Sequence, residues 1–155
     1  MTVFGKPASA YVAFSKGVAL LILGVGLAKL GLSLAGVSNS TTRWLAMNGV
    51  YFFGLLYLAI RVHTTGFGTY KHLLPALLFP SLMLHGVAIT GIVLGMITGH
   101  DNVYTAPEYA FGQDGKTLFH VGMHLVVGIP ASTVFNWIFG CLILLITKKL
   151  IRRTA

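Results

Sequence analysis

The sequence predicts an all-α integral membrane protein with four transmembrane helices and both chain ends on the cytoplasmic side. Of its 155 residues, 55% are hydrophobic and only 9% are charged, and the hydrophobic residues gather in long runs. A soluble domain carries about 25% charged residues, and a disordered chain is poor in apolar residues. These observations exclude both classes and leave lipid as the solvent in which the chain folds.

The apolar runs are each long enough to form a helix that crosses a membrane. At about 1.5 Å per residue, about 20 helical residues cover the roughly 30 Å of hydrocarbon in a bilayer. We therefore expect a single four-helix transmembrane domain over residues 1–155. Its helices are predicted at about 15–37, 44–62, 73–98 and 117–150, with an outer loop at 98–117.

The first run follows two lysines, Lys6 and Lys16, as the core of a secretory signal does. Such a core is about 7–15 residues long, and this run is longer. We interpret it as a retained transmembrane helix. The second run is short and contains one polar interior residue, Asn48.

The fourth run, residues 118–146, is too long for one perpendicular span. It must tilt, kink at Pro130 or project beyond the lipid. Residues 98–117, between the third and fourth helices, form the only substantial loop and are rich in aromatic and polar residues. A loop of this length is more often functional, or a docking surface, than a simple connector.

The charged residues predict the orientation of the chain. Eight basic residues lie on the side of the two chain ends: Lys6, Lys16, Arg61, Lys71, Lys148, Lys149, Arg152 and Arg153. The opposite side carries Arg43, Lys116 and all three acids, Asp101, Glu108 and Asp114. Segments rich in Lys and Arg stay in the cytoplasm, so we expect cytoplasmic termini in a prokaryotic inner or plasma membrane. Lys29, near the outer end of the first helix, can extend its amine outward.

Two helices carry faces of small residues, which let helices approach closely in lipid. The small residues are Gly17, Gly24 and Gly31 in the first helix, and Gly128, Ser132, Asn136 and Gly140 in the fourth. We expect both faces to pack mainly inside the bundle. Contact with a different subunit is the alternative.

Few residues fit familiar catalytic or binding motifs. The basic residues lie at the ends of apolar runs, which argues against nucleic-acid binding. Cys141 is the only cysteine and therefore forms neither an intrachain disulfide nor a cysteine metal site. The sequence contains no suggestive nucleophile–His–acid set, no phosphate-binding glycine loop and no acid within a predicted helix. It assigns no catalytic residues and leaves open whether the chain belongs to an enzyme.

Six histidines against three acids make histidine the main candidate for chemistry. His85 lies near the middle of the third helix, where a polar ring must find a partner. Its small neighbours leave room for a flat tetrapyrrole, and a neutral imidazole is a common axial ligand of haem iron. The alternative is a hydrogen bond to a helix carbonyl, to Ser81 or to an asparagine across the bundle. His63 and His72 flank the cytoplasmic loop and are expected to be solvated or to lie among the lipid headgroups.

His120 and His124 are four residues apart on the fourth helix and therefore share a face. Two imidazoles at this spacing can converge on one metal ion. His100 and Asp101, on the same side of the membrane, are candidates to complete the ligand shell. The glutamate of the HExxH zinc motif is missing, so an ordinary interfacial pair, or a hydrogen-bonding quinone or proton site, remains an alternative.

A depth estimate predicts that His85 and His124 belong to separate sites. His85 lies 12 residues from Leu73, or roughly 18 Å from the cytoplasmic end of its helix. His124 lies 22 residues from Ile146, or roughly 33 Å from the corresponding end. We therefore expect a pigment or haem at His85, and a metal or haem at His100, His120 and His124.

These features favour an integral subunit of a larger membrane complex that transports electrons. Its histidines would hold a haem b, a chlorin or a transition metal, and its partners would be other membrane subunits and lipid. A cofactor-free structural subunit is one alternative. A small homo-oligomeric channel or carrier is another.

Overall fold

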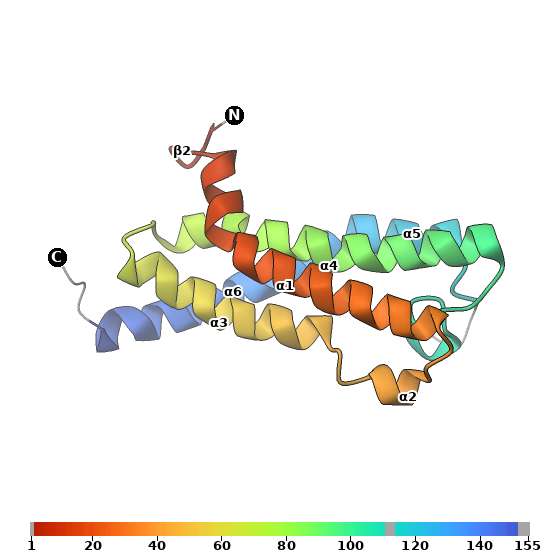
Figure 1. The fold of residues 1–155 in the computed structure, drawn as a ribbon. Coiled ribbons are helices and arrows are strands. Elements are labelled where there is room, and N and C mark those ends of the chain that lie inside the picture. The colour runs from red at the N-terminus through yellow and green to blue at the C-terminus, as the bar shows by residue number, and fades with distance from the viewer. Residues whose placement is uncertain (1, 111–113, 152–155) are drawn as a thin grey trace.

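The computed structural model describes residues 2–110 and 114–151, which form a small N-terminal hairpin and a bundle of helices (Figure 1). In chain order the elements are β1 (Thr2–Val3), β2 (Lys6–Pro7), α1 (Ala8–Leu34), α2 (Asn39–Thr42), α3 (Met47–Thr64), α4 (Tyr70–Thr98), the 3₁₀ turn η1 (Pro107–Tyr109), α5 (Leu118–Met123), the π-helical turn η2 (His124–Gly128) and α6 (Ile129–Leu150). Apart from the two-residue strands, the described elements are helical. The predicted all-α class is confirmed.

Four helical stretches are long and apolar enough to cross a membrane, as the sequence predicted. They are Ala8–Leu34, Asn39–Thr64, Tyr70–Thr98 and Leu118–Leu150. Large apolar side chains remain exposed along them, including Phe53 at 69% and Phe119 at 76% exposure. A soluble monomer rarely exposes apolar surface on this scale.

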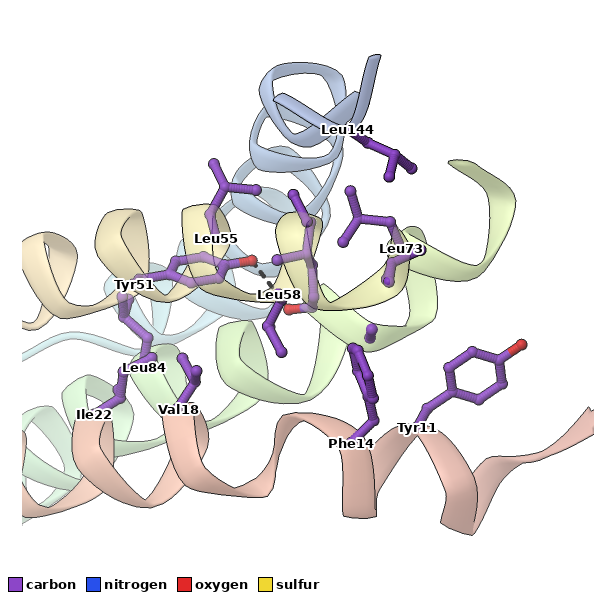
Figure 2. Close-up of a cluster of buried hydrophobic side chains, with 14 of the residues drawn as sticks. Tyr11, Phe14, Val18, Ile22, Tyr51, Leu55, Leu58, Leu73, Leu84 and Leu144 are labelled. Carbon is purple, nitrogen blue, oxygen red and sulfur yellow. Dashed lines mark hydrogen bonds between the residues drawn. The ribbon is translucent and has the colours of Figure 1, made fainter. Parts of the chain in front are cut away.

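Helix α4 occupies the centre of the bundle, in contact with α1, α3 and α6. Figure 2 shows side chains from all four of these helices meeting in one apolar core, among them Ile22, Leu55, Leu73 and Leu144. The Tyr51 hydroxyl group lies in the same core and donates a hydrogen bond to a carbonyl of α4 at 3.0 Å. The same cluster includes Met47 at the start of α3 and Val87 of α4, so the core extends along the bundle toward the end that the 98–117 loop closes.

Helix α1 begins at Ala8, about two turns earlier than expected. The added turns are held by buried aromatic side chains, Tyr11 and Phe14, which pack against the ring of Phe67. These turns stand at an angle to the rest of the helix (Figure 1). The Ser15 hydroxyl group bonds back to the Tyr11 carbonyl oxygen at 2.8 Å, an interaction that often bends helices.

The fourth helical stretch changes its geometry next to its proline. α5 leads into the π-helical turn η2, and Pro130 then lies in the first turn of α6. Proline has no N–H group to continue α-helical bonding, and π-turns are a common way for a helix to absorb such an interruption. The irregularity therefore lies just before Pro130, between His124 and Gly128.

The small-residue faces divide between two environments. A Cβ atom at Gly140 would clash with Leu73 and Leu55, so the face of the fourth stretch packs inside the bundle as expected. A Cβ atom at Gly17, Gly24 or Gly31 would meet nothing within 4 Å. The expectation that the α1 face also packs closely inside the bundle is therefore wrong for the described chain, since these glycines make no close contact with a neighbouring helix.

Candidate functional site

His85 and His124 lie side by side, contrary to the depth estimate. Their Nδ1 atoms are 2.8 Å apart, within hydrogen-bond distance, and their ring centroids are 5.1 Å apart. A hydrogen bond between two Nδ1 atoms needs a proton on one ring and a lone pair on the other. The prediction of two separate histidine sites was wrong.

The error came from the level at which the two helices were aligned. The estimate treated Leu73 and Ile146 as equally deep, whereas Gly140 is the residue that packs against Leu73. This six-residue offset removes roughly 9 Å of the expected difference in depth. The π-helical turn, with its i to i+5 bonding, fits more residues into each turn. It therefore shortens the helix and reduces the difference in depth that remains between His85 and His124.

The second ring nitrogen of His85 is also engaged. Its Nε2 atom lies 3.1 Å from Ser132 Oγ, which in turn lies 2.6 Å from Ser81 Oγ. Both nitrogens of His85 therefore bond within the bundle. In this structure His85 therefore offers no free ring nitrogen to a haem iron. Its neighbour His124 uses only Nδ1 in their contact.

Close packing of η2 against α4 makes these contacts possible. A Cβ atom at Gly128 would lie 2.7 Å from Cε1 of the His85 ring. Because real Cβ atoms do not approach so closely, a glycine at this position lets the ring pack against the backbone of the π-turn.

His120, one turn before His124, is held by its own hydrogen bond. Its Nδ1 atom lies 3.0 Å from the Gly115 carbonyl oxygen. A carbonyl group only accepts, so Nδ1 carries the proton and Nε2 of the neutral ring keeps its lone pair. The ring centroids of His120 and His124 are 5.1 Å apart. Among the described residues, Nε2 of neither ring takes part in a hydrogen bond.

The two histidines line a cavity of about 410 Å³. Its remaining walls come from α1, from the segment before α3 and its first turn, from α4 and from the 98–117 loop. Lys29, Arg43 and Asn48 are polar members of these walls, whereas Leu84 and Ala88 are apolar. The lining of the cavity therefore combines imidazole rings, cationic side chains and apolar side chains.

The 98–117 loop closes this end of the bundle. The Tyr104 hydroxyl group donates to the Gly26 carbonyl oxygen at 3.1 Å, and the Asn102 amide donates to the Gly91 carbonyl oxygen at 2.7 Å. Burial raises the pKa of Tyr104 to about 12, so its hydroxyl group stays protonated at neutral pH. The loop is thus more than a connector, because it inserts Tyr104 between α1 and α4 as a wall of the cavity.

His100 and Asp101 do not join the His120–His124 pair. His100 is exposed, and Asp101 forms a salt bridge with Lys116. Lys116 also pairs with Asp114, whose pKa is lowered chiefly by a hydrogen bond from the Lys116 backbone N–H. In the described part of the chain no group of three or more His, Cys, Asp or Glu side chains is placed to hold a metal ion. The four-residue shell of the sequence prediction is not assembled.

His63 and His72 are buried in the bundle, whereas the sequence suggested that they are solvated or lie among the lipid headgroups. His72 forms a reciprocal cap with Thr69 at the start of α4 and reaches the Phe4 carbonyl oxygen at 3.2 Å. His63 Nε2 lies 2.8 Å from the Ile151 carbonyl oxygen. Both rings tie terminal segments of the chain to the bundle, which their neighbouring basic residues did not reveal.

Ser132 and Gly128 are the site residues that sequence reasoning did not assign to the histidines. Both lie on the small-residue face of the fourth stretch, at spacings of four from His124, and that spacing was the available signal. Comparisons with protein-family models, curated proteins and solved structures found no match to this chain.

Proposed function

We propose that this chain is an integral membrane subunit of a larger redox complex, and that His120 and His124 hold a transition-metal ion in the cavity. The proposal has three parts: membrane insertion with cytoplasmic termini, a metal site, and assembly with other subunits. Each part has its own support.

Insertion and orientation are supported by the two ends of the bundle. The basic residues Lys6, Arg61 and Lys148 lie over the aromatic rings of Phe67, Phe14 and Tyr70 at the end where the chain begins and finishes. The three acids belong to the loop at the opposite end. This separation of charge favours cytoplasmic termini. Arg152 and Arg153, which the sequence prediction counted on the same side, lie outside the described residues.

The observation that carries the metal site is the way the two rings are held. The Nδ1 atom of each ring is bonded to the protein, and each Nε2 atom is left for a ligand. Metal-binding histidines usually donate their other ring N–H group to such a partner, which fixes the tautomer. For His124 this requires its Nδ1–H to donate to His85, and the Nε2–H of His85 to donate to Ser132.

The geometry favours a metal ion over a haem b or a chlorin. With metal–nitrogen bonds of about 2.0–2.1 Å, two imidazoles on one tetrahedral ion have ring centroids about 5 Å apart. The observed separation is 5.1 Å. A haem between His85 and His124 does not fit, because these rings touch. His120 and His124 come from one helix face and do not approach a macrocycle from opposite sides.

Assembly is supported by the open glycine face of α1. A Cβ atom at Gly24 or Gly31 would meet nothing within 4 Å in the described bundle, and small residues are the usual contacts between helices in lipid. A partner subunit at this face would also suit the second candidate function, a structural subunit without cofactor. Metal binding distinguishes the two candidates.

The test is Co²⁺ binding to the purified full-length chain, followed by its visible absorption. We expect one Co²⁺ per chain, and we expect His120→Ala and His124→Ala each to weaken binding by more than the roughly 10–100-fold that loss of an outer-sphere partner costs. His100→Ala is the matched control, because this exposed histidine lies at the same end of the bundle. An unmodified chain that binds no Co²⁺, or a double His120→Ala, His124→Ala variant that binds as tightly, contradicts the metal site and favours the structural subunit.

A further inference from the structure

An apolar groove of about 670 Å³ runs between α1 and α3. Glycine and apolar residues line it, including Gly17, Leu21, Gly49 and Phe53. Its two ends are marked by Trp44 and Ala46 before α3, and by Tyr57 in the body of α3. From Ala46 to Tyr57 the helix rises roughly 16 Å, which is about half the hydrocarbon thickness of a bilayer.

At the Trp44 end the groove adjoins the cavity that holds the histidines. Ala46 lines both, and Arg43 and Lys29 line the cavity together with His120 and His124. The Arg43 guanidinium group lies 5.0 Å from the Trp44 ring centroid, and the Trp44 side chain is 79% exposed. Arginine and tryptophan at the end of an apolar helix are typical of the lipid headgroup level.

The charged side chains that line the cavity are basic, namely Arg43 and Lys29. No Asp or Glu is among the described residues that line the cavity or the groove. The acids of the neighbouring loop contact other groups, since Asp101 and Asp114 pair with Lys116 and Glu108 accepts a hydrogen bond from Asn39. A headgroup with negative charge complements Arg43, and Lys29 adds a second positive charge to the lining of the cavity.

We propose that this surface binds one anionic phospholipid, with its phosphate at Arg43 and Lys29 and one acyl chain in the groove between α1 and α3. The groove matches the length of an acyl chain in a single leaflet, and the cations stand at its headgroup end. In the proposed orientation this is the outer leaflet. The site rests on the membrane insertion of the proposed function and not on metal binding, because none of its proposed contacts uses His120 or His124.

The experiment uses Trp44 as the reporter. The full-length chain with Trp137→Phe is reconstituted into phosphatidylcholine vesicles that contain increasing fractions of dibrominated phosphatidylglycerol, or of dibrominated phosphatidylcholine. Bromine quenches indole fluorescence on contact. We expect phosphatidylglycerol to quench at lower fractions, with a preference of about fivefold per cation.

Variants separate the headgroup from the acyl chain. Arg43→Gln and Lys29→Gln should each lower the preference for phosphatidylglycerol, whereas Lys16→Gln, in the first half of α1, should leave it unchanged. Gly49→Leu fills the groove and should reduce quenching by both lipids. Gly24→Leu adds the same side chain on α1 outside the groove and should not.

Equal quenching by the two lipids overturns the proposal, as does a preference that survives the double Arg43→Gln, Lys29→Gln substitution. Relief of quenching by inorganic phosphate alone also overturns it, because the acyl chain then contributes nothing. If Trp137→Phe fails to fold, native mass spectrometry of the unsubstituted chain tests the same lipid preference. It compares the number of phosphatidylglycerol molecules that the chain retains with the number of phosphatidylcholine molecules. Failure of the unsubstituted chain to enter vesicles would instead contradict the membrane assignment.

Discussion

At the scale of single residues, the histidines differ in what their ring nitrogens do. His85 uses both nitrogens within the bundle, on His124 and on Ser132. His120 uses one nitrogen on a backbone carbonyl group. These bonds orient His120 and His124, so His85 acts in the proposed site as a positioning residue rather than as a ligand.

His85→Ala should lower the affinity of the full-length chain for Co²⁺ by about 10–100-fold, the usual cost of removing a partner from a metal-bound histidine. The physical reason is that His124 loses the acceptor for its Nδ1–H and is free to rotate or change tautomer. His85→Asn should restore part of the affinity, because its side-chain oxygen can accept the same hydrogen bond. The measurement is a Co²⁺ titration followed by absorption. An asparagine variant that binds no better than the alanine variant would show that His85 contributes bulk only.

At the scale of elements, the π-turn η2 brings the fourth helical stretch against α4. Gly128 in this turn faces the His85 ring, and the Ser132 hydroxyl group follows one turn later. Irregular turns of this kind occur frequently at functional sites. Here the turn begins at the proposed metal ligand His124 and ends two residues before Pro130, so one local distortion serves both the proline and the histidine pair.

Gly128→Ala should destabilise the protein by about 1–3 kcal/mol, as overpacking of a close contact commonly does. The added methyl group would lie against His85 and push the two elements apart. Gly122→Ala is the matched control, because a Cβ atom there meets nothing within 4 Å. Thermal unfolding in detergent measures both variants. Equal melting temperatures for the two variants would contradict the close contact between η2 and α4.

At the scale of the whole molecule, the ends of the bundle differ in charge and in construction. One end gathers the hairpin, the loop between α3 and α4 and the last turns of α6, and it carries most of the basic residues. The other end is closed by α2 and by the 98–117 loop, which carries all three acids. This asymmetry is what the proposed orientation in the membrane rests on.

Labelling with a membrane-impermeant maleimide should distinguish the two ends. In a chain with Cys141→Ser, we expect Ser40→Cys to react in intact cells and Thr65→Cys to react only after the membrane is opened. Both positions are exposed loop or short-helix sites at opposite ends of the bundle. The reverse pattern would place the termini outside and contradict the orientation derived from the basic residues.

Much of the fold follows from local sequence. The four helical stretches were predictable because apolar runs of this length have one stable backbone structure in lipid, in which every N–H group bonds within its own helix. The starts of the helices were less predictable. The early start of α1 depends on Tyr11 and Phe14 packing against Phe67, and that contact joins residues distant in the sequence.

The candidate site was only partly predictable. The His120–His124 pair follows from helical spacing alone, since residues four apart share a face. The contact between His85 and His124 did not follow, because it depends on how far two helices slide along each other. Sequence distance from an assumed membrane boundary was a poor guide to that offset.

The sequence alone determined the class of the protein and the residues available for chemistry. Fourteen charged residues, eleven basic and three acidic, against 55% hydrophobic residues predict helices apolar enough to cross a membrane and leave histidine as the main candidate for chemistry. Only the tertiary structure decided which histidines meet. The physical reason is that apolar faces slide over one another at little cost, so the register of two helices depends on packing at particular residues, here Gly140 against Leu73 and Gly128 against His85.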